Sequence, residues 1–369
     1  MVGQRVVTKT EQAVVDPQAS TLVERLTASV GTLHPGYFAL VMATGIVSVG
    51  LDSVGWPLAS QALLVLTLTC YVVLLVLFGW RWIRFRDRVL ADVANPAKAF
   101  AYFTFVAGSA VLGTRLLADG YVVLTIALFT VAGTAWLFLG YVIPWAVVLW
   151  RPDRPILAKA NGTWFIWTVA SQSVAVIAAS LQPVVSQDRR ELAIIAVTCW
   201  SVGAALYVCT GVMVAIRLLN YDVSPVEVGQ PYWVSMGATA ITVLAGARIV
   251  AMADAPMVDA TRGLVAGVSV LFWGFGTWLW PLLIAAGIWR HLVHKVPLTY
   301  EAPMWSMVFP LGMYAVASIN LGLADRLPVV EEVGRIEIWL AVVVWAAVFV
   351  GMLRNAVATV LRPPRRSGR

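Results

Sequence analysis

The chain has 369 residues, of which 60% are hydrophobic and only 12% are charged, with a net charge of +7 and a mean hydropathy of +0.83. Soluble domains carry about 25% charged residues, so this composition excludes a soluble globular domain and indicates an integral membrane protein. The positive charge does not indicate a nucleic-acid partner, because the basic residues lie in short connections between apolar segments, where they report membrane topology.

The N-terminal segment is polar and contains no apolar signal-peptide core. Four aliphatic residues within it, Leu22, Leu26, Val30 and Leu33, recur at nearly helical spacing. We therefore expect a short helix that lies on the membrane surface.

Ten apolar segments follow, each long enough to cross about 30 Å of hydrocarbon, which takes about 20 helical residues. The predicted fold class is an all-α integral membrane protein with ten transmembrane helices. The predicted spans are residues 36–54, 58–81, 98–117, 121–149, 162–182, 192–218, 232–252, 263–290, 303–323 and 336–359. The predicted domains are a cytoplasmic N-terminal segment (1–34), a ten-helix transmembrane pore domain (35–360) and a basic cytoplasmic tail (361–369).

Lys and Arg are distributed unequally over the connections between these spans. The two termini and the connections after spans two, four, six and eight hold 19 of the 26 basic residues, and the remaining seven lie elsewhere. The positive-inside rule then predicts a multi-pass protein of the inner (plasma) membrane, with both termini in the cytoplasm and the odd-numbered spans running outward.

A pair of bulky residues opens every odd-numbered span. The pairs are Tyr37-Phe38, Tyr102-Phe103, Trp164-Phe165, Tyr232-Trp233 and Met304-Trp305, at successive spacings of 65, 62, 68 and 72 residues. Aromatic belts are common at membrane interfaces, but they do not explain five near-equal periods in phase with the helical hairpins. We predict five quasi-repeated hairpins around a central pore, with one helix of each hairpin inside.

Phe309 is the candidate gate of this pore. It is followed at once by Pro310 within the ninth span, so its ring lies at a helix bend. The residues in register with it in the other odd spans are Met42, Ala107, Val169 and Gly237, none of them aromatic. One phenyl ring facing this gate layer would close a narrow bore. The alternative is an ordinary core phenylalanine beside a tolerated kink.

A layer of hydroxyls lies two residues further along the same spans. It consists of Thr44, Ser109, Ser171 and Thr239, with Leu311 in the fifth position. Two helical residues turn the side-chain direction by about 200°, so this layer and Phe309 do not face the axis together. We predict that these hydroxyls bond neighbouring helices or their own backbone instead.

The face that carries Phe309 continues toward the outer ends of the odd spans with few polar residues. The candidates for pore lining and anion binding are Thr114, Gln172, Asn320, Arg115 and Arg248. An arginine within a span usually faces protein or water. Arg248 lies on the predicted pore face and is expected to attract anions. The alternative for both arginines is an extended side chain that reaches the outer interface, and for Arg115 the two interpretations have equal weight.

Several chemistries have no signal in this sequence. Acidic residues are missing from the middle of the predicted spans, which favours anions over cations, and no relay of buried carboxylates or histidines for protons is evident. The motifs of ATP-binding loops, zinc-dependent hydrolases and serine hydrolases are absent. His291 and His294 lie in a basic loop, which disfavours a metal site. We expect no enzyme activity, no cofactor and no metal.

Two segments resemble one family. The segment from Tyr37 to Ser48 reads YFALVMATGIVS and the segment from Trp305 to Gly312 reads WSMVFPLG. They look like the first and ninth spans of the family of bacterial tellurite-resistance proteins, fungal malate and sulfite transporters, and plant slow-type anion channels. The resemblance implies a homotrimer with one pore per subunit, in which small anions pass a constriction at Phe309.

The predicted function is an anion channel or transporter that passes small anions such as malate-like dicarboxylates, sulfite, nitrate or chloride. Proton-coupled transport of a dicarboxylate or sulfite is the alternative within transport. A non-conducting membrane scaffold or receptor is the alternative from another class. The expected partners are small anions and the lipid bilayer.

Overall fold

A computed structural model describes residues 22–150, 155–253 and 255–358 of the chain. The predicted tail over 361–369 and most of the predicted N-terminal segment therefore lie outside the described residues. Within these ranges the regular structure is helical throughout, and ten helical segments are long and apolar enough to cross a membrane. The predicted class, an all-α membrane protein, is confirmed.

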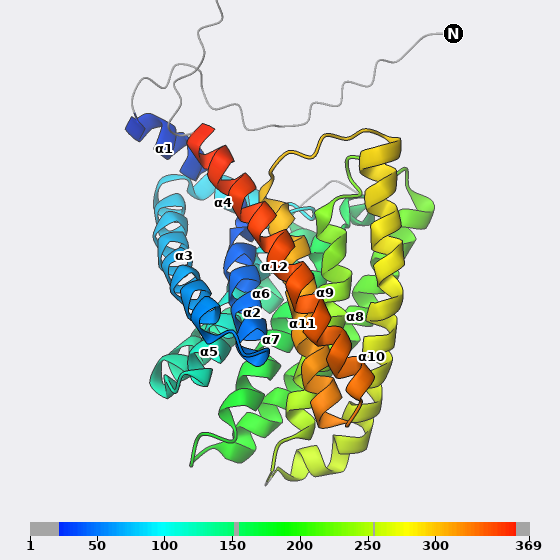
Figure 1. Ribbon diagram of the computed structural model, residues 1–369. Helices are drawn as coiled ribbons and strands as arrows, with labels where there is room; N and C mark the ends of the chain where they lie inside the picture. Colours follow the sequence, from blue (N-terminus) through cyan, green and yellow to red (C-terminus); the bar gives the residue numbers. More distant parts are fainter. Residues whose placement is uncertain (1–21, 151–154, 254, 359–369) are drawn as a thin grey trace, which may run out of the picture.

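The long helices are of two kinds, which alternate along the chain (Figure 1). The inner helices are α2 (Ala39–Ser53), α5 (Thr104–Ala118), α7 (Phe165–Leu181), α9 (Val234–Val250) and α11 (Trp305–Ala324). The outer helices are α3 (Pro57–Arg84), α6 (Val122–Leu149), α8 (Arg189–Asn220), α10 (Pro256–Ile288) and α12 (Pro328–Ala356). In the inner spans 78–94% of the most apolar window is buried, against 11–44% in the outer spans. The apolar surface of the outer helices is therefore left to face lipid.

Short elements complete the chain. The helices α1 (Leu22–Gly31) and α4 (Arg86–Val93) lie on the side of the molecule where α12 ends (Figure 1). The segment η3 (Ile156–Lys159) is a 3₁₀ helix, and η6 (Trp289–Val293) is a π-helical turn that ends α10. A helix over 22–31 was expected from the aliphatic spacing, and it packs beside α3.

Three outer helices begin earlier than the sequence predicts. The helices α8, α10 and α12 start at Arg189, Pro256 and Pro328, whereas the predicted spans began at residues 192, 263 and 336. Their first turns carry charged residues that lower the local hydropathy. Those same turns hold a carboxylate near the helix N-terminus, where the helix dipole favours negative charge. Proline at the first helical position of α10 and α12 is also compatible with a helix start.

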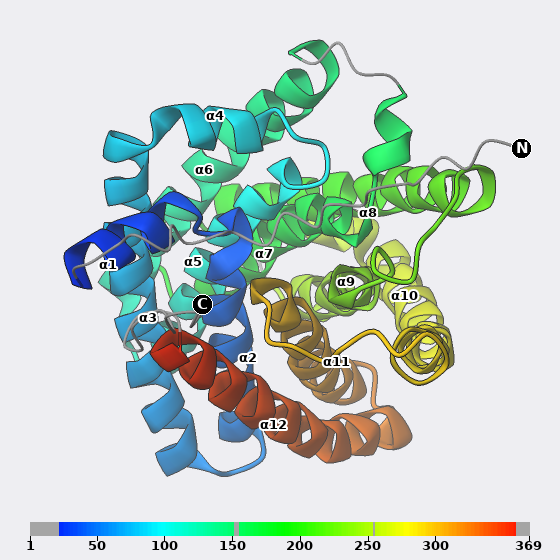
Figure 2. The same cartoon turned by 90° about the horizontal axis from the view of Figure 1, so that it is seen from above.

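The inner helices pack against one another in a closed order: α2, α5, α7, α9, α11 and back to α2. Each also packs against the outer helix that follows it in the chain. Figure 2, a view along the helices, shows α2, α5, α7, α9 and α11 in the middle, with α3, α6, α8, α10 and α12 around them. Five consecutive hairpins thus contribute one inner helix each.

Every outer helix has an aromatic side chain that donates to, or shares, a hydrogen bond with the inner helix of the next hairpin. The five contacts are Tyr71 to the Ser109 hydroxyl (2.9 Å), Trp136 to the Ser171 hydroxyl (2.7 Å), Trp200 to the Thr242 carbonyl (3.0 Å), Trp273 to the Ser318 hydroxyl (2.9 Å) and Trp345 to the Thr44 hydroxyl (3.0 Å). We call these contacts the five clasps. The last of them joins α12 to α2 and closes the order of hairpins.

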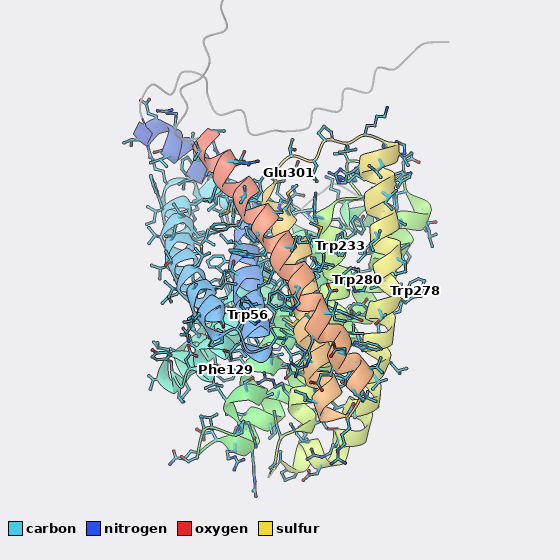
Figure 3. All side chains as sticks on the ribbon, viewed as in Figure 1. Trp56, Phe129, Trp233, Trp278, Trp280 and Glu301 are labelled. Carbon is cyan, nitrogen blue, oxygen red and sulfur yellow. The ribbon has the colours of Figure 1, made fainter. Side chains whose placement is uncertain are left out.

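The outward faces of the outer helices carry other aromatic residues. Trp278 points away from α10 and is 60% exposed, whereas Trp280 packs edge-on against Trp233 with 5.8 Å between the ring centroids (Figure 3). Trp56 likewise packs on Trp339. One face of α10 is thus left for lipid and the other for protein.

A short 3₁₀ helix precedes each inner helix and contains or adjoins the bulky pair seen in the sequence. These helices are η1 (Pro35–Phe38), η2 (Ala99–Phe103), η4 (Gly162–Trp164), η5 (Gln230–Trp233) and η7 (Ala302–Met304). Each contacts its two neighbours, so the five also close on themselves. Gly162 lies directly against the carbonyl of Pro231, where a Cβ has no room. The bulky-pair repeat therefore marks a structural unit at the mouth of the bundle.

Candidate functional site

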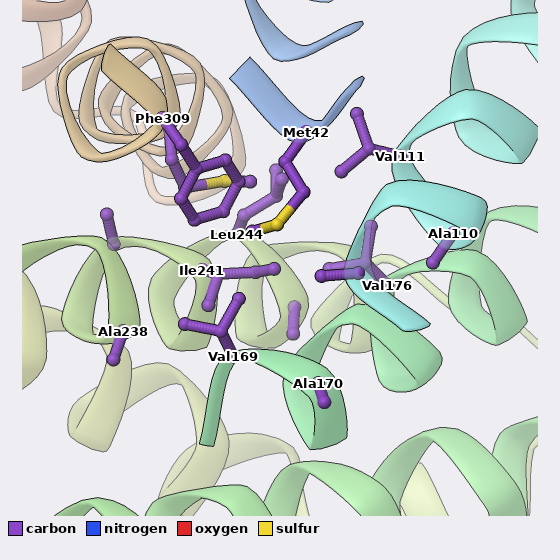
Figure 4. Close-up of a cluster of buried hydrophobic side chains, with 14 of the residues drawn as sticks. Met42, Ala110, Val111, Val169, Ala170, Val176, Ala238, Ile241, Leu244 and Phe309 are labelled. Carbon is purple, nitrogen blue, oxygen red and sulfur yellow. The ribbon is translucent and has the colours of Figure 1, made fainter. Parts of the chain in front are cut away.

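Phe309 lies among the inner helices and is 1% exposed. Figure 4 shows its ring pointing away from α11, with Met42 of α2 beside it and Ile241 of α9 and Val169 of α7 below it in the view. Met42 and Val169 are themselves buried, as is Ala107. The structure therefore brings Phe309 together with residues predicted for its layer, in the middle of the bundle.

Gly237 of the predicted gate layer has a different position from the other members. A Cβ on Gly237 would lie 2.9 Å from Cγ and 3.3 Å from Cα of Pro310. The missing side chain thus faces the bend of α11 and allows α9 to approach it closely. Gly237 supports the backbone that carries Phe309.

A cavity of about 20 Å³ lies between the five inner helices. Its lining residues are Ile46, Val49, Ala110, Val111, Thr114, Ser173, Val176, Ile241, Leu244, Arg248 and Met313. All five inner helices contribute, and Met313 lies one helical turn beyond Phe309 on α11. We call this space the central cavity. Room for a water molecule takes about 10–15 Å³ of such volume, so the cavity holds little more than one.

Arg248 is the one charged residue among the described residues that line the central cavity. The hydroxyls of Thr114 and Ser173 donate to carbonyls of their own helices, at 2.9 and 2.7 Å. The wall is therefore apolar except at the guanidinium of Arg248.

The guanidinium of Arg248 has little compensation from the protein. Its Nη1 donates to the Ser180 hydroxyl at 3.3 Å, and its Nε is buried without a hydrogen-bond partner among the described residues. Within the described part of the chain no carboxylate lies within 4.0 Å of it. A buried charge needs a partner or water. The charge of Arg248 therefore faces the central cavity without a carboxylate counterpart among the described residues.

Arg115 is held differently and does not line the central cavity. Its Nε donates to the hydroxyls of Ser48 and Ser60, both at 3.0 Å, and its Nη1 donates to Asp119 at 2.8 Å. A second carboxylate, that of Asp52, lies 3.8 Å from Nη2. The pore-lining prediction for Arg115 differs from this placement, because the side chain turns toward α3 and links three helices.

Gln172 and Asn320, also predicted for the pore lining, do not line the central cavity. The Gln172 amide donates to the carbonyl of Trp200 in α8 at 3.1 Å, so the side chain points away from the central cavity. The Asn320 amide donates to the carbonyl of Val316 in its own helix at 2.8 Å. One residue shifts the direction of a helical side chain by about 100°. Ser173 therefore faces the central cavity, whereas the preceding Gln172 faces α8.

The hydroxyl layer faces outward, as predicted. Thr44, Ser109 and Ser171 take part in three of the five clasps, with partners on α12, α3 and α6. Thr239 donates to the carbonyl of Met236 in its own helix at 2.6 Å. None of these four hydroxyls lines the central cavity.

A model of the family described as voltage-dependent anion channel matches residues 32–353. The chain belongs to this family. The match covers all ten spans except the last three residues of α12, and the suspected resemblance is confirmed.

Relatives of this voltage-dependent anion channel family member are known from bacteria, archaea and fungi. An uncharacterized membrane protein of Mycobacterium tuberculosis is 59% identical over 162 residues, which is 44% of this chain and 82% of that protein. An uncharacterized transporter of Methanocaldococcus jannaschii is 26% identical, over 85% of this chain and 90% of its own. A sulfite efflux pump of Arthroderma otae is 22% identical, over 87% and 90%. The family consists of channels and transporters, which agrees with the expectation of a non-enzyme.

Glu337 is a residue of this family member that the sequence analysis missed. It lies inside α12, which begins at Pro328, and its Oε1 is buried without a hydrogen bond among the described residues. The predicted span began at residue 336, so this carboxylate was assigned to the end of the helix. Pro328, a typical first residue of a helix, was the signal that would have placed it inside. An ionisable residue within a span is a functional candidate by default.

Proposed function

We propose that this protein passes small anions through the middle of the bundle, along a path that includes the central cavity. The observation that carries the proposal is the guanidinium of Arg248, which has no described carboxylate partner on a wall shared by all five inner helices. A fixed positive charge in an apolar surround raises the local concentration of anions. Membership of the voltage-dependent anion channel family supports the same function.

Phe309 acts as the gate in this proposal. The central cavity of about 20 Å³ is too small for an anion such as sulfite or malate. The ring of Phe309 lies one helical turn from it and is 1% exposed. Conduction therefore requires the ring to move, and Pro310 and Gly237 supply a bend and a close helix contact at that point.

Sulfite is the first substrate to test, because a named sulfite efflux pump is similar over most of its length. Purified protein in liposomes should release sulfite, nitrate, chloride or malate down a gradient. A panel of these four anions identifies the substrate by the rates. If the protein is incorporated into the liposomes but none of the four anions is released, the protein is a scaffold or receptor and the proposal fails.

The orientation, membrane and oligomer are part of the proposal. The basic connections and both described chain ends lie on one side of the bundle (Figure 1), which we assign to the cytoplasm of a cell with the protein in its inner membrane. Three copies with one pore each follow from the family resemblance. Native mass spectrometry of the purified protein measures the copy number directly.

Proton-coupled transport is a second candidate, and Glu337 is the observation that favours it. Its Oε1 is buried within a span without a hydrogen-bond partner among the described residues, and ionisable residues at such positions form the proton relays of transporters. Under this mechanism a pH gradient alone drives uphill accumulation of the anion, and Glu337→Gln abolishes the accumulation while downhill flux remains. Accumulation that never exceeds the electrochemical equilibrium of the anion excludes the coupling.

A further inference from the structure

A second cavity, of about 800 Å³, lies between α10 and α12 and away from the central cavity. We call it the α10–α12 groove. Its walls include Leu283 and Gly287 of α10, Met307 of α11, and Val344, Ala347 and Gly351 of α12. The connection from α10 to α11, which runs between these two helices in Figure 2, adds Leu298 and Tyr300 to the lining. Its volume lies within the roughly 300–1,000 Å³ of small-molecule sites.

The body of the α10–α12 groove is apolar and opens on the lipid-facing surface. Lining side chains that remain exposed include Ile284 and Ile288 of α10 and Val343 of α12, with Leu292 at 72% exposure. These residues belong to spans that cross the membrane. The groove is therefore accessible to acyl chains of the surrounding bilayer.

The end of the groove on the basic side of the molecule carries positive charge. Arg290, His291 and Arg354 line it, and none of the described lining residues is acidic. Arg354 is exposed and has no hydrogen bond or ion pair with a described residue. Nδ1 of His291 lies 2.8 Å from the carbonyl of Val296, so it carries the proton and leaves Nε2 for another partner.

Arg290 adds a buried charge below this end. Its Nη1 donates to the carbonyls of Val226 at 2.6 Å and Pro225 at 3.2 Å, whereas its Nε is buried without a partner among the described residues. Carbonyl contacts leave its charge without a carboxylate counterpart in the described part of the chain. The end of the groove therefore presents a net positive potential.

A lateral cavity at the opposite side of the molecule has the reverse charge. It measures about 520 Å³, lies where α7 ends and α8 begins, and includes Asp188 and Glu191 among its lining residues. Within its described lining no residue is basic. Positive charge is thus a property of the α10–α12 groove and not of every lateral cavity of this bundle.

We propose that the α10–α12 groove binds an anionic phospholipid from the membrane leaflet on the basic side of the molecule. The acyl chains lie between α10 and α12, and the phosphate lies near Arg354 and His291 above Arg290. Basic pockets between transmembrane helices on the cytoplasmic side bind anionic headgroups by such complementarity. The bound lipid would contact both α10, the outer helix of the fourth hairpin, and α12, the outer helix of the fifth.

The experiment is native mass spectrometry of the full-length protein, titrated with dioleoylphosphatidylglycerol or dioleoylphosphatidylcholine. Wild type is expected to bind the glycerol lipid more tightly. Arg354→Ala should weaken that binding about fivefold, since one basic residue near an anionic surface contributes about 1 kcal/mol. Ala347→Trp should block the acyl chains and weaken it further.

Two matched controls lie outside the groove. Arg84→Ala removes an exposed arginine at the end of α3, and Ala346→Trp places the same large ring one residue away from the lining position. Neither should change the affinity. Equal affinity in all five proteins, or equal binding of both lipids by wild type, overturns the proposal. A change of copy number in Ala347→Trp without lost lipid also overturns it, because a second copy of the chain then occupies the groove.

Discussion

Buried arginines have different roles in this protein, depending on the partners that they meet. Arg81 is paired with Asp92 at 2.6 Å and Arg115 with Asp119 at 2.8 Å, and both are nearly fully buried. These pairs neutralise the buried charges, and breaking such a pair by removing a partner costs about 3–5 kcal/mol. Arg248 has the Ser180 hydroxyl in place of a carboxylate, so its charge is left for the central cavity.

Arg248→Gln is expected to lower anion flux by at least about tenfold, because a charge that focuses anions raises their arrival rate by roughly 10–10³. Flux of the best anion from liposomes is the measurement. Arg248→Lys keeps the charge and should retain most of the flux. Wild-type flux in Arg248→Gln would show that this arginine only anchors the helix end.

Phe309→Ala is expected to raise anion flux, because it removes the ring that we propose as the gate beside the central cavity. Truncation of a core phenylalanine costs about 3–5 kcal/mol in stability, so melting temperature is measured beside flux. Phe103→Ala is the matched control, since Phe103 is fully buried and packs on Phe100 and Trp167 instead. Stability lost without any rise in flux would identify Phe309 as a packing residue.

At the scale of the helices, the five clasps repeat one contact around the bundle. Each joins an outer helix to the next inner helix by a bond of 2.7–3.0 Å. Hydrogen bonds between membrane helices average about 0.6 kcal/mol and reach about 1.7. Five of them around the bundle hold the hairpins in a fixed order, and the pair of Trp345 and Thr44 is the one that joins the last hairpin to the first.

Trp345→Phe keeps the aromatic packing and removes the indole donor to Thr44. We expect a loss of stability of about 0.6–1.7 kcal/mol, seen as a lower melting temperature in detergent. Trp339→Phe is the control, since Trp339 packs edge-on against Trp56 at the exposed surface. If both substitutions lower the melting temperature equally, the hydrogen bond of the clasp contributes nothing measurable.

The cap of η1 should make stability depend on pH. Nδ1 of His34 accepts from the amide of Gly36 at 3.0 Å. Burial, with the nearby charge of Lys98, lowers the pKa of His34 from 6.5 to about 4. The native state thus holds His34 neutral while the unfolded chain binds a proton below pH 6.5, so this stabilisation is complete above 6.5 and is lost as the pH falls toward 4.

The measurement is the melting temperature of purified His34→Asn and wild type between pH 7.5 and pH 4. This range covers the two pKa values of His34, 6.5 in the unfolded chain and about 4 in the folded protein. Asparagine also accepts the cap hydrogen bond but does not titrate. The variant should therefore lose less stability over this window than the wild type. Parallel curves for the two proteins would assign the acid sensitivity to other groups.

For the whole molecule, hydropathy determined the ten spans and their pairing into hairpins, because a helix in lipid must be apolar over its length. The bulky pairs marked the 3₁₀ helices at the mouth, and the helical period correctly turned the hydroxyl layer away from Phe309. The same period failed for Gln172, since its direction depends on a contact with α8 that hydropathy does not encode.

The sequence by itself determined the membrane class, the number of helices and the family. Tertiary structure alone decided which polar residues face the central cavity, because each buried polar group bonds the partner that packing brings within reach. Arg115 donates hydrogen bonds to Asp119 and to two serines, whereas no described carboxylate lies within ion-pair distance of Arg248. That difference depends on the neighbours supplied by other helices, and it assigns the charge of Arg248 to the cavity.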